Sequence, residues 1–358
     1  MDNMQKILIY HIGSLGDTLV AIPALRVVRM NYPQAYITMM TDDQPGRRLV
    51  QANDILNGSG LIDDYILYSA GSQLSLVRLL LRLRHEKFDG LIYLIRITHG
   101  GRRLFRDKLY FKLAGIKRFF CLQGGANPYE ISSGSVLPRM PHVTDIFLSR
   151  LAASGMEVSL DGDGKRHLRI GAHECDEVER WLAELPSSRG RKWIGVGIGG
   201  KMAVKIWPLE RYERLVDRLI ETCDVWPVVF GGPESLADGH KLVGHWKRGY
   251  VACGALGIRA AIEALSRCSL FVGNDTGTIH MAAAAGVRCV GVYSSRDYPG
   301  LWEPYGSGHI VFRTPLPCEG CMLEECAAQH MKCILSISVE PVFQACRTII
   351  EEEAGRKV

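Results

Sequence analysis

Several short polar segments follow apolar stretches of this 358-residue chain, and their residue types suit the binding of a phosphate. In VGNDTGTIHMAAAAG, residues 272–286, an apolar run leads into Asn-Asp-Thr-Gly and then into alanines. Glycines allow close approach of the backbone to an anion, and the N–H groups at a helix N-terminus bind phosphate. We therefore expect the backbone of Thr276–Thr278 to hold a phosphate.

Two further segments add groups that a nucleotide needs. Lys205 follows Gly199-Gly200 in GIGGKMAVKIWP, and Glu234 follows Gly232 in FGGPES. A lysine supplies a compact positive charge to phosphate, and an acidic residue accepts hydrogen bonds from ribose hydroxyls. Glycine turns at strand ends are ordinary when taken singly. Together these segments predict a nucleotide pocket.

A carboxylate occupies a comparable place near the N-terminus. In HIGSLGDTLVAIPAL, Gly13 and Gly16 flank a turn and Asp17 stands at the start of a helix. Helix capping explains an Asp there, and a general base is the alternative. The spacing is not the G-x-G-x-x-G of a dinucleotide fold, and the pair Asp42-Asp43 begins 29 residues past Gly13, where about 20 is usual. A NAD enzyme is therefore disfavoured.

The elements that must position these residues alternate between strand and helix. Apolar runs predict strands, and amphipathic stretches between them predict helices. Such alternation is typical of parallel, doubly wound sheets. We expect two similar Rossmann-like α/β domains that face a central cleft. The predicted strands are 6–13, 35–41, 90–95, 118–122, 192–200, 225–232, 250–254, 270–275 and 289–294, and the predicted helices include 17–32, 72–85, 102–115 and 208–221.

Linker-like composition divides the chain. Residues 160–167 and 185–192 are rich in Gly, Ser and charge, and they bracket a predicted helix. We expect an N-terminal acceptor-binding domain, an interdomain linker and helix, a C-terminal nucleotide-sugar-binding domain, and a final helix that packs back toward the first domain. The corresponding residues are 1–165, 166–190, 191–335 and 336–358.

The composition is that of a globular protein, with 47% hydrophobic and 23% charged residues. No apolar run approaches the ~18 residues that span a bilayer, and no signal-peptide pattern is present, so we expect a cytoplasmic protein. Residues 78–118 carry twelve Lys and Arg against three Asp and Glu, a net charge of +9, whereas the whole chain carries +5. This basic window is either a solvated helical face or a surface for an anionic partner. Nucleic acid is disfavoured because aromatic residues are not interleaved.

Four segments together resemble the ADP-heptose:lipopolysaccharide heptosyltransferases, glycosyltransferase family 9. These are GDTLVAIPALRVVR, KIWPLERYERL, GGPES and NDTGTIHMAAAAGV, in the family's order and spacing. The cysteine-containing tail and RDKLYFKLAGIKR also resemble family segments, so the likeness covers most of the chain. The resemblance implies a GT-B architecture and inverting transfer from a nucleotide sugar, most simply ADP-heptose. The implied acceptor is an anionic glycolipid or a lipopolysaccharide-type glycan, reached by peripheral contact with the inner membrane.

The resemblance also assigns roles to residues. Asp17 matches the family's catalytic base, Lys205 the lysine at the donor diphosphate, and Glu234 the ribose-binding glutamate. Gly199-Gly200 stand where the family usually has Pro-Gly, and the 96–106 segment departs from the standard heptosyltransferase pattern. The implied donor-binding residues are Gly199, Gly200, Lys205, Gly232, Glu234, Asp275, Thr276, Gly277 and His280, and the implied acceptor-binding residues are Gly13, Gly16, Arg96, Arg102, Arg103 and Arg106.

The residue types fit this chemistry without a catalytic metal. A carboxylate can take the acceptor's proton, while Lys205 and backbone N–H groups stabilise the departing diphosphate. The one Asp-x-Asp pattern, Asp161-Gly-Asp163, lies in the linker. A carboxylate beside a phosphate is repulsive, so Asp275 is expected to cap its helix or orient Lys205. For His280, core packing and ligand contact remain alternatives.

Two other functions stay open, namely a nucleotide-sugar epimerase or other GT-B enzyme, and a non-catalytic sugar-nucleotide binding protein.

The tail contains four cysteines within 16 residues, in the spacing Cys-x2-Cys-x4-Cys-x6-Cys. Thiolates in such a cluster suit a tetrahedral structural Zn or Fe site, although no second Cys-x2-Cys follows the first. Free thiols are the alternative. The four are Cys318, Cys321, Cys326 and Cys333.

Overall fold

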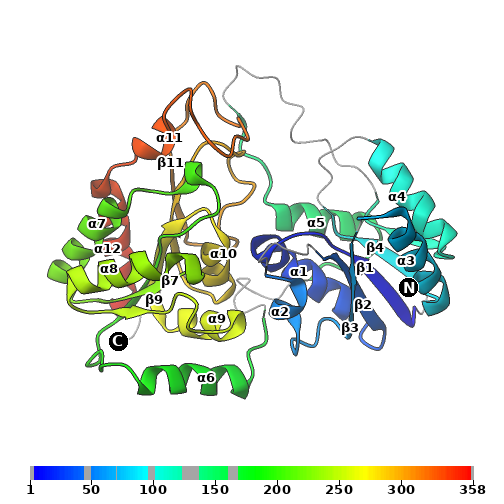
Figure 1. Ribbon diagram of the computed structural model, residues 1–358, viewed down its shortest axis with the longest axis horizontal. Coiled ribbons are helices and arrows are strands. Elements are labelled where there is room, and N and C mark those ends of the chain that lie inside the picture. Colours follow the sequence, from blue (N-terminus) through cyan, green and yellow to red (C-terminus); the bar gives the residue numbers. More distant parts are fainter. Residues whose placement is uncertain are drawn as a thin grey trace. The chain divides into compact units, whose positions relative to one another are not determined.

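A computed structural model gives the fold (Figure 1). It describes residues 4–43, 50–69, 71–95, 101–122, 137–159 and 168–355. The chain divides into two compact units, each built on a parallel sheet. The first consists of Met1–Ile131, Pro141–Gly162 and His167–Arg169, and the second of Ser132–Met140, Asp163–Arg166 and Ile170–Val358. The predicted fold class, two Rossmann-like parallel-sheet domains, is confirmed.

The sheet of the first unit has the strand order β3-β2-β1-β4-β5, and every pairing is parallel. Its strands are β1 (Lys6–Tyr10), β2 (Tyr36–Asp42), β3 (Asp64–Tyr68), β4 (Gly90–Tyr93) and β5 (Arg118–Phe120). Its helices are α1 (Leu15–Asn31), α2 (Ala52–Leu56), α3 (Gln73–Glu86), α4 (Gly101–Leu113) and α5 (Val143–Ala153). The order reverses between β1 and β4, which makes the end of β1 a topological switch point.

The sheet of the second unit has the order β11-β10-β9-β6-β7-β8 and is also parallel. Its strands are β6 (Trp193–Gly197), β7 (Trp226–Phe230), β8 (Tyr250–Val251), β9 (Cys268–Asn274), β10 (Cys289–Tyr293) and β11 (Ile310–Arg313). Its α-helices are α6 (Ala172–Ala183), α7 (Leu209–Cys223), α8 (Leu236–Trp246), α9 (Ile258–Ser266), α10 (Gly277–Ala284), α11 (Lys332–Leu335) and α12 (Val339–Gly355). The short 3-10 turns η2 (Ala203–Lys205) and η3 (Pro233–Ser235) follow β6 and β7.

Continuous apolar strands form the two cores, as expected for sheets that are covered on both faces. In the first unit Leu8, Leu91 and Phe111 belong to one buried cluster. In the second unit one buried cluster joins β6 and β9 to α7 and α12 through residues such as Leu215 and Phe343. Each sheet therefore determines where the residues just beyond its strand ends lie.

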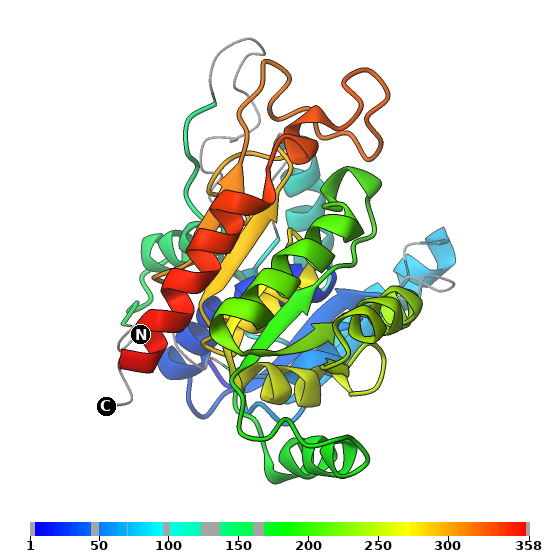
Figure 2. The same cartoon turned by 90° about the vertical axis from the view of Figure 1, so that its left-hand side faces the viewer.

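The last helix, α12, packs against α7 and β9 of the second unit, and Figure 2 shows it beside that sheet. Its predicted return to the first domain stays a prediction, as do the predicted domain boundaries. The helix α6 packs against α9, where Glu174 forms an ion pair with Arg259 at 2.5 Å. Two strands, β3 and β11, were not among those predicted. No helix in the described part of the chain is long and apolar enough to cross a membrane.

Candidate active site

The donor-side candidates lie where the second sheet reverses its strand order. The order runs from β6 to β7 and β8 on one side and from β9 to β10 and β11 on the other. Lys205 follows β6, and Asp275 follows β9 directly. Ligands of open α/β sheets bind beyond the strands' carboxyl ends at such a point. The topology alone thus brings these two distant segments together.

Lys205 and Asp275 form an ion pair. The lysine Nζ lies 2.6 Å from the Asp275 Oδ2 atom, and the two side chains are 16% and 5% exposed. An ion pair with so little exposure is held in place more firmly than a surface pair, because solvent screens it less. Orienting Lys205 was one of the two roles expected for Asp275. The pair leaves the other N–H donors of the ammonium group available to a ligand.

Asn274, which was not among the predicted site residues, fixes the ends of the segment that carries Lys205. Its amide is fully buried, and Oδ1 accepts hydrogen bonds from the Trp207 backbone N–H at 3.0 Å and the Tyr212 hydroxyl at 2.8 Å. Its Nδ2 donates to the carbonyl oxygens of Ile198 and Gly199, at 2.9 and 3.3 Å. The segment between residues 199 and 207 is therefore held at both ends by one side chain.

The start of α10 offers backbone donors at this point. Thr276 is the N-cap residue of α10, and its hydroxyl lies 2.9 Å from that of Thr278. The first N–H groups of a helix have no partner within the helix, so they can bind an anion. Gly200 lies against this turn, because a Cβ atom added there would be 3.2 Å from Thr276 Cγ2. Gly277, the first residue of the helix, adds one of these N–H groups.

The remaining glycines of the predicted pocket are also explained by packing. A Cβ at Gly199 would lie 2.4 Å from the Ser235 hydroxyl, and a Cβ at Gly232 would lie 2.3 Å from a Glu234 carboxylate oxygen. Glu234 thus folds back over Gly232. Burial, with a smaller contribution from the Glu234 charge, raises the pKa of the nearby Cys253 thiol to about 12. Both glycines give room to side chains of the chain itself.

His280 lies in α10 and is buried. Its ring meets Trp302 edge-on, with 6.4 Å between the ring centroids and 71° between the ring planes. The structure thus shows a packing contact of His280, which was one of the two alternatives. Ligand contact by the same side chain stays a prediction.

In the first unit, Asp17 is the third residue of α1, at the switch point after β1. Its Oδ2 atom accepts hydrogen bonds from the Ser14 backbone N–H at 2.9 Å and the Ser14 hydroxyl at 3.1 Å. The carboxylate therefore caps the helix, as the capping alternative required. Its other oxygen, Oδ1, makes no hydrogen bond with a described residue, so capping leaves that oxygen available to a ligand.

Because residue 13 is a glycine, there is room beside it for the Asp17 side chain. A Cβ atom at residue 13 would lie 2.2 Å from the Asp17 Cβ and 2.7 Å from its Cγ. His11 is buried beside the same turn, and its Nδ1 lies 3.0 Å from the Leu94 carbonyl oxygen. Burial lowers the pKa of His11, so the imidazole is neutral at neutral pH. Gly16 is the second residue of α1.

The acceptor-side arginines differ in their contacts. Arg106 donates to the Asp107 Oδ1 atom at 2.9 Å, and Arg103 Nε lies 3.8 Å from Oδ2. Asp107 is buried and also accepts a hydrogen bond from the Tyr93 hydroxyl at 2.9 Å. Arg102 is exposed and has no ion pair with a described residue. Arg96 lies outside the described residues, as do Asp161 and Asp163 of the linker.

A second polar network, also missed from the sequence, anchors the loop that carries Cys318 and Cys321. Arg296 donates to the Leu323 carbonyl oxygen at 2.7 Å and to that of Met322 at 2.8 Å. Arg313 forms an ion pair with Glu319 at 2.7 Å. Both arginines have their charged groups largely removed from water, so they hold the loop to the end of β10.

The four tail cysteines share one neighbourhood. Partial burial and then the charges of Cys321, Cys333 and Cys326 raise the pKa of the Cys318 thiol. Yet among the described residues, which include all four, no group of three or more metal-ligating side chains is gathered as a metal site. As placed, the thiols do not fit a metal ion. The zinc or iron site stays a prediction, which metal analysis of protein purified without a His tag can test.

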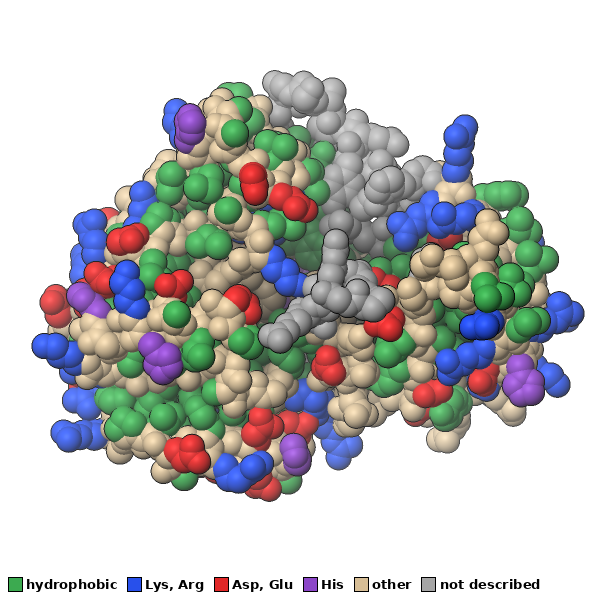
Figure 3. Space-filling view, in the orientation of Figure 1, with side chains coloured by type: hydrophobic (Ala, Val, Ile, Leu, Met, Phe, Trp, Pro, Cys, Tyr) green, Lys and Arg blue, Asp and Glu red, His purple; other side chains and the backbone are tan. Residues whose placement is uncertain are grey.

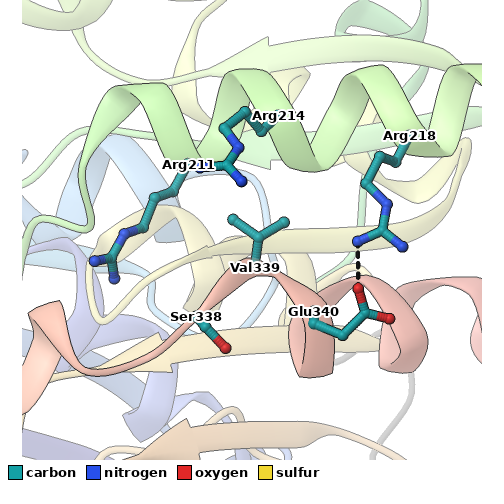
Figure 4. A pocket seen from close by; sticks show the side chains of 6 residues that line it. All are labelled: Arg211, Arg214, Arg218, Ser338, Val339 and Glu340. Atoms are coloured by element: carbon teal, nitrogen blue, oxygen red, sulfur yellow. Dashed lines mark hydrogen bonds and ion pairs between the residues drawn. The ribbon is translucent and has the colours of Figure 1, made fainter.

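A cavity of about 320 Å³ lies between α7 and the start of α12 (Figure 4). Arg211 donates to the Ile337 carbonyl oxygen at 2.6 Å, and Arg218 forms an ion pair with Glu340, also at 2.6 Å. The Arg218 guanidinium also lies 3.8 Å from the centre of the Phe343 ring. These contacts attach α12 to α7. None of the predicted donor-binding residues lines this cavity.

Comparison with known proteins agrees with this geometry. Residues 164–332 match the model of glycosyltransferase family 9 (heptosyltransferase). A putative glycosyltransferase of Haemophilus influenzae is 23% identical over 97% of this chain and 100% of its own length. A family 9 glycosyl transferase structure from Veillonella parvula is 22% identical, covers 98% of both chains and has a TM-score of 0.74. The Escherichia coli heptosyltransferase WaaC, solved with ADP, is 16% identical, covers 96% of this chain and 100% of its own, and has a TM-score of 0.66.

The two parallel-sheet units and their switch-point residues define a protein with the fold of the GT-B heptosyltransferases. The match of residues 164–332 to the family 9 model confirms the resemblance found in the sequence. The chain is heptosyltransferase-like, and this match supports sugar transfer.

The position of Lys205 predicts that removal of this lysine weakens the binding of ligands that carry phosphate and spares those that do not. Lys205→Ala should weaken binding of ADP by about 10- to 100-fold, since a charge-assisted hydrogen bond contributes about 1.5–3 kcal/mol. Binding of adenosine, which has no phosphate, should change little. Calorimetric titration of both ligands measures the difference. Lys201→Ala is the matched control, because Lys201 is an exposed lysine of the same loop. Equal losses for ADP and adenosine would show that Lys205 does not contact the phosphates.

Proposed function

We propose that the protein is an inverting glycosyltransferase that transfers a sugar, most simply heptose from ADP-heptose, to a lipopolysaccharide-core or related anionic glycan. The observation that carries the proposal is the Lys205–Asp275 pair beside the start of α10. It places a fixed positive charge next to backbone donors at the switch point of the second sheet. The family match and the WaaC structure with ADP support an ADP-linked donor.

The donor diphosphate would bind at this point. Its negative charge grows as the bond to the sugar breaks, and Lys205 and the N–H groups of Gly277 and Thr278 stabilise that charge. Asp275 keeps the lysine in place, so no reorganisation is needed during the reaction. Glu234, which folds over Gly232, would turn toward the ribose hydroxyls when the nucleotide binds. In this mechanism the proton and charge transfers require no catalytic metal.

Asp17 would act as the general base. Ser14 holds its Oδ2 atom, which leaves Oδ1 to accept the proton of the acceptor hydroxyl. The acceptor oxygen then forms a bond to the anomeric carbon as the nucleoside diphosphate leaves from the opposite face. The proton passes to Asp17, and the electron pair of the broken bond remains on the diphosphate. The same carboxylate thus caps α1 and serves the reaction.

The acceptor would bind to the first unit. Its anionic groups are attracted to the basic window, in which Arg102 is exposed and Arg103 and Arg106 share Asp107. Arg102 is therefore the clearest candidate for direct contact. Gly13 leaves room for the Asp17 side chain.

The role of Asp17 can be tested by Asp17→Asn, which keeps the shape and much of the capping but removes the base. Turnover should fall roughly 10²–10⁴-fold while ADP affinity is retained. The chain supplies a matched control in Asp54→Asn, because Asp54 caps α2 from the same third position and accepts from the Gln51 backbone N–H at 3.0 Å. Near-normal turnover by Asp17→Asn would remove Asp17 from the mechanism, whereas a non-catalytic binding protein would show no turnover even when unmutated.

The acceptor site predicts a different pattern for Arg102→Glu. The kcat/KM for the acceptor should fall about tenfold or more at low salt, because the reversed charge repels the anionic acceptor. The KM for the donor should not change. Arg180→Glu, on the exposed part of α6 in the second unit, is the control. An unchanged kcat/KM for the acceptor in Arg102→Glu would contradict an acceptor contact at this residue.

A further inference from the structure

Exposed apolar side chains are concentrated on two neighbouring helices of the first unit. Of the fourteen large hydrophobic side chains that are exposed in the described structure, six belong to α3 and α4. Their exposed fractions range from 49% for Leu109 to 70% for Phe105. Large apolar patches on a surface usually mark a site of interaction. The six are Leu74, Val77, Leu81, Phe105, Leu109 and Leu113.

On α3 these side chains form one stripe. Leu74, Val77 and Leu81 are spaced by three and four residues, so they lie on the same face of the helix. The opposite face is buried in the core through Leu79 and Leu83. The exposed arginines of this helix lie beside the apolar stripe, and these are Arg78, Arg82 and Arg84.

On α4 the pattern repeats. Phe105, Leu109 and Leu113 are each four residues apart and are exposed, whereas Phe111 on the other face is buried. The two helices are tied together by the Tyr110 hydroxyl, which donates to the Leu76 carbonyl oxygen at 2.7 Å. Figure 1 shows α3 and α4 side by side, and Figure 3 shows hydrophobic side chains next to Lys and Arg side chains over this part of the first unit. The exposed basic residues of α4 are Arg102, Arg106, Lys108 and Lys112.

The acidic side chains of the two helices do not offset this charge at the surface. There are two of them, Glu86 and Asp107. Glu86 forms an ion pair with Lys6, and Asp107 is buried against Tyr93. The exposed face of α3 and α4 therefore combines apolar stripes with basic residues. This combination is typical of helices that lie in the interface of an anionic membrane.

We propose that the exposed face of α3 and α4 docks on an anionic lipid bilayer. The apolar side chains enter the boundary between headgroups and acyl chains, while the arginines and lysines reach the negatively charged headgroups. A second copy of the chain is a poorer occupant, because it would bring two positively charged faces together. This docking rests on the proposed function in one respect, because it would bring the protein to an acceptor that is held in the membrane.

The test separates the apolar contribution from the charge. We compare the full chain with the variant Leu81→Ser/Phe105→Ser/Leu109→Ser, which keeps every basic residue, in sedimentation with phosphatidylglycerol vesicles and with phosphatidylcholine vesicles. The unmutated protein should bind the anionic vesicles, and raising salt should weaken but not abolish binding. The variant should lose about tenfold or more in partitioning, because three side chains that would enter the bilayer no longer bury apolar surface there. The matched control is Leu236→Ser/Met322→Ser/Leu335→Ser, which changes exposed hydrophobic side chains of the second unit. This control should bind the anionic vesicles normally.

Two further measurements make the result decisive. Thermal unfolding and ADP affinity, measured on the same variant, should match those of the unmutated protein, which excludes a general loss of folding. Vesicle binding requires no donor, so a failure of sugar transfer would not affect it. Equal vesicle binding by the variant and the unmutated protein would overturn the proposal. The proposal would also be overturned if the unmutated protein formed an oligomer that the variant did not form, and neither protein bound vesicles. The face would then be an interface between copies of the chain.

Discussion

The buried amide of Asn274 is the constraint on which the donor site depends. It occupies the end of β9 and makes four hydrogen bonds, to the loop after β6 and to the residues that start α7. Leaving a buried polar group without its partner costs roughly 1–3 kcal/mol, so the three segments are held in one arrangement. Lys205 lies between the anchored residues, and Asp275 follows Asn274 directly. The ion pair between them is thus a consequence of the way the strand ends are joined.

Much of this could be predicted from the sequence. Apolar runs located most strands, and the Lys205 and Asp275 segments could be placed at strand ends because parallel strands direct their carboxyl ends to one edge. The strands β3 and β11 were missed because Asp64–Tyr68 is partly exposed, and Ile310–Arg313 is an edge strand without a clear alternation. Asn274 was missed because an amide within a phosphate-binding motif gives no sign that its partners are distant backbone groups.

One side chain can serve packing and chemistry at once, and the geometry of Asp17 allows this. Its carboxylate completes the capping of α1, and Gly13 has no side chain because the Asp17 side chain takes that space. The sequence offered capping and catalysis as alternatives, but the two oxygens of one carboxylate allow both. Gly199 and Gly232 are similar cases, since Ser235 and Glu234 fill the space beside them. The sequence could not show this, because these contacts depend on side-chain positions across turns.

The central claim, that Asn274 positions Lys205 for a diphosphate, is tested most directly by a double-mutant cycle. ADP affinity is measured for the unmutated protein, Asn274→Ala, Lys205→Ala and the double variant, with circular dichroism to confirm that each is folded. If Asn274 acts through Lys205, its removal should weaken ADP binding about as much as Lys205→Ala, and the double variant should be little weaker than either. Wild-type ADP affinity in folded Asn274→Ala, or losses that simply add in the double variant, would contradict the account.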